Sequence, residues 1–415
     1  MPVKPETDRP LDRVRVGLIG LGTVAQACHL PLLDRLAERF ELTAVADLSP
    51  TLRAELGARH RVPPERRFPT GEELLEAGGL DAVLVLTPGS HGSICAAAIE
   101  RGLPVFVEKP LAYTTAEIDE LAAALERRAG RLELGYMKLY DPAVARVREA
   151  ASRRREGGVS LRSIEITVLH PPGEPQLAHA HLVHASDAPP EPLRALAGET
   201  SRLRAEALGE APEWLARLYT DVLLGSVVHE LALVRDFAGD PVAIDRAGAW
   251  SSGTWPPSVE LDGRLAGGAR LSIRWHYLPG YPAYREIVRL VWEDGSAELE
   301  FPAPYLLNAP TSIRLVERDG ASRRDTEFTS YVEAFEEELV AFHRLVVDGT
   351  PPAAGTTEAR ADTVTCQRVA RRLADGLGLP IGGEAAALPL ADVNADATAP
   401  LDAVRAQLSW TTRPS

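Results

Sequence analysis

The chain has 415 residues, of which 45% are apolar and 25% are charged, and its formal net charge at pH 7 is -14. A chain of this size and composition can bury a sizeable core and is long enough for two or three domains. The acidic balance argues against nucleic acid or an anionic membrane surface as a partner, because both attract a basic protein face.

Neither a targeting segment nor a disulfide framework is indicated. The first residues, MPVKPETDRPLDR, lack the apolar core of a signal peptide, and no apolar run approaches the roughly 20 residues that span a bilayer. The three cysteines, Cys28, Cys95 and Cys366, lie far apart and form no CxxC pair. We therefore expect a cytoplasmic protein without a thiolate metal site.

The first part of the chain alternates between strand and helix patterns. Helical spacing follows the first apolar run, and Thr114 with Glu117 has the spacing of a capping box at the start of a later helix. Strands that are apolar throughout and separated by single helices indicate a parallel sheet covered on both faces. The predicted strands are 14–19, 42–46, 82–86, 105–107 and 132–134.

The pattern changes after about residue 138. A helix at 142–155 and a strand at 161–169 are followed by a proline-rich stretch, 171–212, that we interpret as loop. After a helical region to about 237, short period-two segments separated by Gly, Asp-Gly or Pro turns predict a mostly antiparallel sheet, and two helices end the pattern. These segments are 243–250, 259–265, 270–277, 286–292, 297–301 and 312–316, and the helices are 331–347 and 357–377.

The predicted fold is α/β, with a doubly wound parallel sheet followed by an α+β domain that carries an open, mostly antiparallel sheet. We expect an N-terminal extension at 1–12, a nucleotide-binding domain at 13–138, a substrate and oligomerisation domain at 139–385, and a tail at 386–415.

Gly20-Leu-Gly22-Thr-Val-Ala25 is a GxGxxA motif between a predicted strand and a helix. The first glycine makes the tight turn, the second lets the backbone approach a pyrophosphate, and the small third residue permits close helix–strand packing. Asp47 ends the second strand, where a carboxylate accepts hydrogen bonds from the adenosine ribose hydroxyls. The sequence therefore predicts a dinucleotide site. Asp47 would repel the 2′-phosphate of NADP and so favours NAD, but Arg53 could offset this repulsion, so NADP remains an alternative.

Lys109 stands out because lysine is so rare. The 45 basic residues comprise 42 arginines and three lysines, Lys4, Lys109 and Lys138. Lys109 ends a predicted strand, at the edge where such sheets bind ligands. A compact ammonium polarises a carbonyl, and desolvation tunes its pKa for proton exchange, which arginine does poorly.

Together these motifs resemble the Gfo/Idh/MocA oxidoreductases. The resemblance rests on the glycine loop, on Thr87-Pro88 followed by His91, on Glu108-Lys109-Pro110 and on the segment DGTPPAAGTTEARAD, and it covers about residues 13–382. It implies a Rossmann domain, a second domain whose sheet often forms an oligomer interface, and NAD(P)-dependent hydride transfer on a sugar-type hydroxyl or ketone. The implied partners are a carbohydrate-like small molecule and further copies of the chain.

The resemblance also implies roles for individual residues. Lys109 lies beside the nicotinamide and the reacting carbon, and Lys138, with Tyr140 beside it, reaches the substrate. The alternative for Lys138 is that it pairs with Asp141 or with the nearby helix. Cofactor contacts are implied for Gly20, Gly22, Thr23, Val24, Ala25, Asp47, Thr87, Pro88, His91, Glu108 and Lys109.

The second proton-transfer group is incomplete. The family places an Asp four residues before a His on a helix, and His229 matches that histidine while position 225 is glycine. Asp221 is two turns back, and on an ideal helix Glu230 points about 100° away. Three explanations of the missing Asp stay open: Lys109 and His229 are enough for proton transfer, Lys138 takes the role of the Asp, or the substrate differs from the usual polyol. The alternative for His229 is that it is a packed core histidine.

Two further groups have open interpretations. His179, His181, His184 and His170 suggest either a metal cluster or a contact with substrate, and we expect no metal site. The aromatic residues Trp275, Tyr277, Tyr281 and Tyr284 suit either stacking on a sugar or a buried face.

We therefore predict an oxidoreductase that acts on a sugar, sugar nucleotide, glycoside or cyclitol, with Lys109 and His229 handling the proton. The alternative is a protein of this fold that binds NAD(P) without turnover, as a sensor or scaffold, and Gly225 keeps that alternative open.

Overall fold

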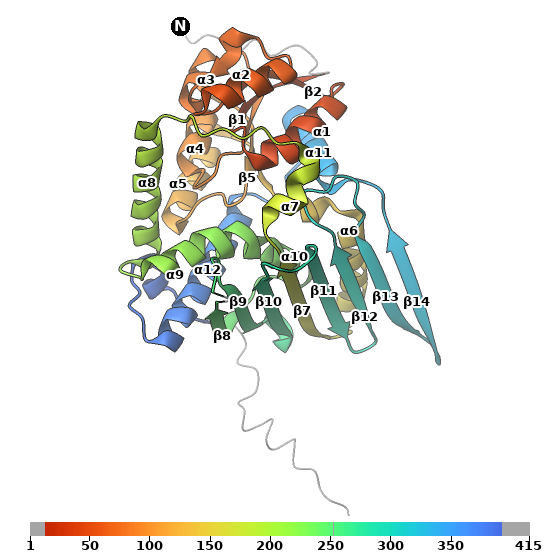
Figure 1. Cartoon of the computed structure of the whole chain (residues 1–415). Coiled ribbons are helices and arrows are strands. Elements are labelled where there is room, and N and C mark those ends of the chain that lie inside the picture. The colour runs from red at the N-terminus through yellow and green to blue at the C-terminus, as the bar shows by residue number, and fades with distance from the viewer. Residues whose placement is uncertain (1–12, 252, 392–415) are drawn as a thin grey trace, which may run out of the picture.

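A computed structural model describes residues 13–251 and 253–391. The predicted extension at 1–12 and the last part of the predicted tail, 392–415, lie outside the described residues. The described residues are arranged around two sheets, one in the upper part of Figure 1 and one in the lower part. No helix in the described part of the chain combines the length and apolar character needed to cross a membrane.

The first sheet is parallel, with the strand order β3-β2-β1-β4-β5-β6. The predicted five-strand series is confirmed, and a two-residue strand, β3, extends it. The strands are β1 (Val14–Ile19), β2 (Phe40–Ala46), β3 (Arg67–Phe68), β4 (Ala82–Val85), β5 (Val105–Glu108) and β6 (Leu132–Gly135). Because the order reverses direction between β1 and β4, the carboxyl ends of these two strands flank a crevice of the kind that binds dinucleotides.

Helices cover both faces of this sheet. They are η1 (Ala25–His29) with α1 (Leu30–Arg35), α2 (Pro50–Arg59), α3 (Gly71–Ala77), α4 (Gly92–Glu100) and α5 (Thr115–Arg128). The predicted capping box of α5 is present, because Thr114 accepts from the Glu117 backbone and Glu117 accepts from the Thr114 backbone.

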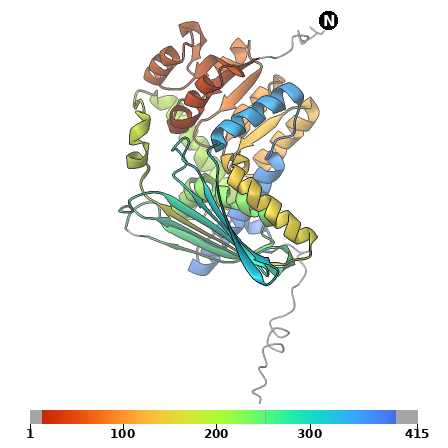
Figure 2. The ribbon, with the colours of Figure 1, turned by 90° about the vertical axis from the view of Figure 1, so that its right-hand side faces the viewer.

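A helix from far along the chain completes the packing. Phe335, Leu339 and Phe342 of α11 (Ala334–Asp348) are buried in one apolar cluster with Val14 and Phe106. Figure 2 shows α11, in blue, beside the first domain. The core beneath the first sheet is therefore not built from the N-terminal third of the chain alone.

The second sheet has eight strands in the order β14-β13-β12-β11-β7-β10-β9-β8. Only the β7–β10 pair is parallel, so the predicted mostly antiparallel sheet is confirmed. The strands are β7 (Leu161–His170), β8 (Ala243–Trp250), β9 (Ser258–Arg264), β10 (Arg270–Tyr277), β11 (Arg285–Trp292), β12 (Gly295–Phe301), β13 (Ser312–Asp319) and β14 (Ser322–Thr329). Sequence analysis missed β14 because this edge strand, SRRDTEFT, is almost fully exposed and carries no apolar alternation.

The interpretation of residues 171–212 as loop is wrong in its second half. Residues Pro190–Leu208 form α8, a helix of 19 residues, and a short helix α7 (Gly173–Leu177) lies before it. The prolines that suggested a loop gather around the first turn of α8, where backbone N–H groups need no intrahelical partner. Most of the helix is exposed, and only Leu203, Ala207 and Leu208 near its C-terminus are buried.

The helical region that follows is interrupted. Between α9 (Glu213–Leu218) and α10 (Val228–Ala238), residues Tyr219–Val227 form a π-helical segment, η5. Its wider turn changes which residues share a face, so ideal α-helical spacing does not apply across Gly225. The remaining long helices are α6 (Pro142–Glu156) and α12 (Thr356–Leu377).

Candidate active site

The glycine loop lies in the crevice between β1 and β4. Gly20 has a φ of +97°, and a Cβ there would lie 2.7 Å from the Thr87 nitrogen, so only glycine fits. A Cβ on Gly22 would meet no atom of the chain within 4 Å. The third motif position, Ala25, is fully buried in the helix that follows. The backbone at Gly22 therefore borders open space at a helix N-terminus, as a pyrophosphate requires.

The Asp47 carboxylate is fixed directly beside this loop. One oxygen accepts from the backbone N–H of Leu21 at 2.8 Å and the other from that of Ser49 at 2.8 Å. Arg53 donates to the carbonyl oxygens of Asp47 and Leu48, at 2.5 and 3.1 Å. These residues fit the adenosine ribose of a nicotinamide dinucleotide, whose hydroxyls donate to such a carboxylate.

Thr87, Pro88 and His91 lie in the turn between β4 and α4. His91 is buried, and its ring nitrogens lie 2.7 Å from the Pro110 carbonyl oxygen and 2.6 Å from that of Thr87. Burial lowers the pKa of His91, and the hydrogen bonds to the two carbonyls oppose that shift. His91 thus ties the end of β4 to the Glu108-Lys109-Pro110 turn and positions both.

Glu108 is held underneath that turn. Its carboxylate lies 3.1 Å from His29 Nε2 and accepts from the backbone N–H of Lys109 at 3.2 Å. Burial by itself raises the pKa of Glu108, but the hydrogen bond from His29 and the charges of His29, Lys109 and His91 together outweigh it, and the net shift is downward. The ionised carboxylate is therefore a support for Lys109 from within the first domain.

The Lys109 ammonium meets the second domain. Nζ donates to the carbonyl oxygen of Gly225, at 2.6 Å. Burial lowers the pKa of Lys109, and Lys138 contributes in the same direction, whereas Glu108 and Glu230 oppose the shift. Position 225, where the family Asp is missing, thus contacts the lysine through its backbone.

His229 lies close enough to Lys109 for the charge of the lysine to act on the imidazole. Burial lowers its pKa well below the ordinary value, and the charges of Lys109 and Lys138 lower it further. Its ring stands edge-on to Tyr136, with centroids 6.0 Å apart, and its buried Nδ1 pairs with no group of the described chain. The imidazole is therefore neutral near pH 7 and available to accept a proton.

Asp221 does not supply the missing carboxylate. It lies at the surface and accepts from Arg204 at 3.1 Å, with Arg217 3.6 Å away.

Lys138 is buried in an ionic cluster. Its ammonium lies 3.1 Å from Glu230 and 2.5 Å from Glu286, and it faces the Phe301 ring. Burial alone lowers the pKa of Lys138, but the two carboxylates reverse this and the net shift is upward. Burial raises the pKa of Glu230 to about 7. The alternative partner Asp141 is instead bonded to Thr311 and to the first turn of α6.

Tyr140 is not brought to this group. Its hydroxyl donates to Glu133 at 2.6 Å and accepts from the Ala353 backbone, on the side of β6 and the chain before α12.

Aromatic side chains at the carboxyl ends of β7 and β10 complete the surroundings of Lys109. The His170 ring lies 5.3 Å from Trp275, 6.4 Å from Tyr277 and 5.5 Å from Tyr284. Trp275 donates to the Ser226 hydroxyl at 2.9 Å, next to the carbonyl that Lys109 contacts. Burial and the Lys109 charge both lower the pKa of His170.

The four histidines weighed as a metal cluster are dispersed. His179 lies outside the aromatic group and is bonded to the Gln176 and Tyr305 carbonyls. Within 13–251 and 253–391, no three His, Cys, Asp or Glu side chains are arranged to hold a metal ion.

Sequence analysis missed Glu286 and gave Glu230 no role. Glu286 lies on the same face of β11 as the buried Val288 and Leu290, so a carboxylate at an inward position was the available signal. Glu230 is buried in α10, where its carboxylate lies 3.1 Å from the Lys138 ammonium.

The chain is similar in sequence to known oxidoreductases. Residues 14–136 match the model of the oxidoreductase family with an NAD-binding Rossmann fold, GFO_IDH_MocA. The chain is 32% identical over 232 residues to inositol 2-dehydrogenase of Acidothermus cellulolyticus, covering 55% of this chain and 54% of that protein. It is 25% identical over 372 residues to inositol 2-dehydrogenase 3 of Saccharopolyspora erythraea, covering 89% and 95%. The alignment thus spans about half of the first relative and nearly all of the second.

The fold as a whole is also found in solved structures. UDP-N-acetylglucosamine 3-dehydrogenase from Acidithiobacillus ferrooxidans superposes with a TM-score of 0.64 and 22% identity, covering 88% of this chain and 99% of that chain.

The buried cluster yields a stability prediction. Replacing Lys138 by Met leaves two carboxylates together without their cation, and we expect the free energy of unfolding to fall by about 3–5 kcal/mol at pH 8. Urea unfolding measures this, with the exposed Arg162→Met as control. A decrease in the free energy of unfolding of less than about 1 kcal/mol would contradict the buried ionic cluster.

Proposed function

Because the chain belongs to the Gfo/Idh/MocA oxidoreductase family, we propose that it moves hydride between a bound nicotinamide and a carbinol or ketone carbon of a cyclitol or sugar-type substrate. One observation carries the proposal: the 2.6 Å contact of Lys109 Nζ with the Gly225 carbonyl joins the dinucleotide-binding sheet to the segment that carries His229.

Asp47 and the glycine loop would hold NAD, with the nicotinamide directed toward Lys109 at the end of β5. Lys109 would bind the reacting oxygen. Its ammonium stabilises negative charge on that oxygen, and its lowered pKa makes proton exchange with it less costly. His229 would share the proton as a neutral imidazole.

The substrate class is supported by the groups around Lys109. His170 and Tyr284, which are part-buried, would offer ring edges against which the C–H face of a cyclitol or sugar packs, while Lys109 and His229 would meet its hydroxyls. Lys138 would act indirectly, because its ammonium is already bonded to Glu230 and Glu286.

Replacing Lys109 by Met tests the proposal. A screen of myo-inositol, glucose and a UDP-sugar with NAD identifies a substrate, and we expect Lys109→Met to lower kcat/KM for it by about 100-fold or more, since acid–base groups typically contribute that much. NADH binding, followed by fluorescence, should stay within about threefold of the parent protein.

Lys109→Arg is the matched variant, since it keeps the charge but not the compact ammonium, and it should be nearly as inactive. Full activity in Lys109→Met would sink the catalytic assignment. NADH binding without turnover in the parent chain on any tested substrate would favour a sensor or scaffold, the alternative that Gly225 keeps open.

The pH dependence follows from the His229 shift. Alcohol oxidation needs a neutral base, and a lowered pKa keeps His229 neutral below the usual value of about 6.5. We expect kcat/KM for oxidation to stay constant through pH 6.5 and to decline only at lower pH. His179→Gln should leave the profile unchanged, whereas a midpoint above about 7 would contradict the assignment.

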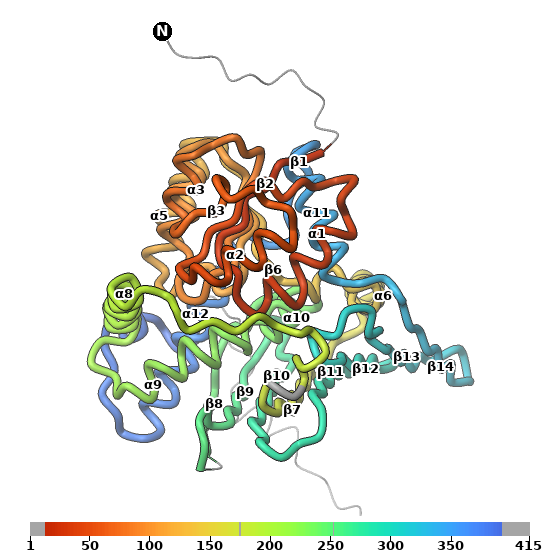
Figure 3. The backbone as a smooth tube through the Cα atoms, turned by 45° about the horizontal axis from the view of Figure 1, so that its top comes forward, coloured from red at the N-terminus to blue at the C-terminus, as the bar shows by residue number. Residues whose placement is uncertain are grey.

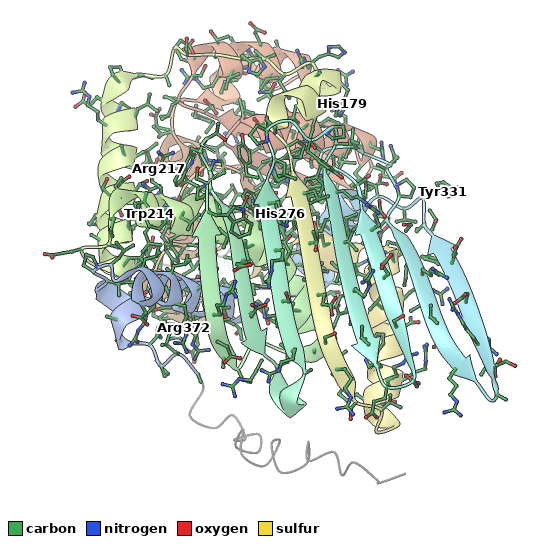
Figure 4. The ribbon with its side chains drawn as sticks, turned by 60° about the horizontal axis from the view of Figure 1, so that its bottom comes forward. His179, Trp214, Arg217, His276, Tyr331 and Arg372 are labelled. Atoms are coloured by element: carbon green, nitrogen blue, oxygen red, sulfur yellow. The ribbon has the colours of Figure 1, made fainter. Side chains whose placement is uncertain are left out.

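We also propose that the chain forms a homo-oligomer through the open face of the second sheet. Figure 4 shows these strands in front, with the helices behind them. The face is lined by ion pairs between neighbouring strands, such as Arg289–Glu298 and Arg285–Glu300, and the intervening Ile287 and Val291 are part-buried. Light scattering should give a mass of at least twice 44.8 kDa, and Ile287→Asp should lower it. A monomeric parent protein would refute this interface.

A further inference from the structure

A stretch of extended chain between the two sheets contacts the cofactor side of the first domain. We call residues 181–189, which precede α8, the crossing segment. Figures 1 and 3 show it, in yellow-green, running from the α7 side of the molecule to α8 across the first domain. It belongs to neither sheet, so the contacts that hold it in this place bear on its role.

The first anchor lies at the glycine loop. The Val183 backbone N–H donates to Gln26 Oε1 at 2.8 Å, and Gln26 Nε2 donates to the Val183 carbonyl oxygen at 3.2 Å. The same Gln26 amide donates to the Leu21 carbonyl oxygen at 2.9 Å. The crossing segment is therefore one side chain away from the GxGxxA loop.

The second anchor lies at the N-terminus of α2. The Asp187 carboxylate accepts from the Ser49 hydroxyl, from the Thr51 backbone N–H at 3.0 Å and from the Thr51 hydroxyl at 2.7 Å. Ser49 is also the residue that caps α2. These hydrogen bonds, that of Ser49 first, lower the pKa of Asp187 to about 2, so the side chain is an anion at neutral pH.

This second anchor adjoins the predicted ribose site. Asp47, which accepts from Leu21 and Ser49, is the carboxylate positioned for the ribose hydroxyls. A phosphate on the 2′-hydroxyl would extend beyond Asp47 toward the Ser49 and Thr51 hydroxyls and the Thr51 backbone N–H at the start of α2. A helix N-terminus with hydroxyl donors suits an anion. Here the protein's own anion already occupies those donors.

We propose that Asp187 excludes the 2′-phosphate of NADP and is, with Asp47, a determinant of preference for NAD. The proposal rests on the proposed function, since it requires dinucleotide binding in the first place. Asp187 acts in two ways: it engages the donors a phosphate would use, and its charge repels a phosphate. Arg53, which would attract a phosphate, is held by the Asp47 and Leu48 carbonyls.

A purely structural role for Asp187, as an attachment point of the crossing segment, makes a different prediction. In that case, its removal changes the binding of NADH and NADPH by the same factor. The ratio of the two dissociation constants therefore separates specificity from attachment.

The test is a fluorescence titration of the full chain with NADH and with NADPH. For Asp187→Asn, which keeps an acceptor but removes the charge, we expect NADPH affinity to rise by about fivefold while NADH affinity changes less than twofold. For Asp187→Ala, which also frees the Ser49 and Thr51 donors, we expect a gain of about tenfold for NADPH. Glu191→Gln removes the same charge from an exposed position at the start of α8 and should leave the ratio unchanged.

The possible results separate a role of Asp187 in cofactor specificity from a failure of the proposed function. A parent preference for NADH that narrows in both Asp187 variants, but not in the control, supports the assignment. An unchanged ratio in the Asp187 variants, or a parent chain that prefers NADPH, overturns it and leaves the proposed function standing. A parent chain that binds neither nucleotide overturns the proposed function and this inference with it.

Discussion

The ammonium of Lys109 is part-buried between two domains, and the protein must compensate for its partial loss of water. The Gly225 carbonyl accepts its hydrogen bond, and Glu108 and Glu230 lie close enough to favour its charge, while Lys138 opposes it. These partners come from β5, the π-helical segment and α10. The lysine therefore has its properties only when the two domains are docked, because no single element surrounds it.

The same constraint explains the second buried cluster. Lys138, Glu230 and Glu286 come from three elements, and the Tyr284 hydroxyl also donates to Glu286 at 2.6 Å. A charge cluster with so little water tolerates the loss of one member poorly, so it fixes how η3 (Met137–Tyr140), α10 and β11 pack. Since Glu230 directly follows His229, this packing also fixes the helix that presents the histidine. We therefore regard Lys138 as a residue that positions the site.

The crossing segment connects cofactor choice to the second domain. Asp47 is supplied by the first sheet, whereas Asp187 arrives from a stretch of chain that ends in α8. A local sequence motif describes only the first of these. Cofactor preference in this chain is thus a property of both domains, and changing the residues that follow β2 alone would leave an anion in place.

The sequence alone determined the first sheet and its glycine loop, because apolar strands, single helices and GxGxxA are local patterns whose physics needs no distant partner. It also singled out Lys109, since a compact ammonium among 42 arginines is a chemical choice visible in composition. It did not reveal α8, which begins in a proline-rich stretch, or β14, whose side chains face solvent. Only the tertiary structure paired Lys138 with Glu230 and Glu286, turned Tyr140 toward Glu133 and brought Asp187 to Ser49. The physical reason is common to all three: a polar side chain that leaves water takes whichever partner the packing brings within reach, and for Lys138 and Asp187 that partner is distant in sequence.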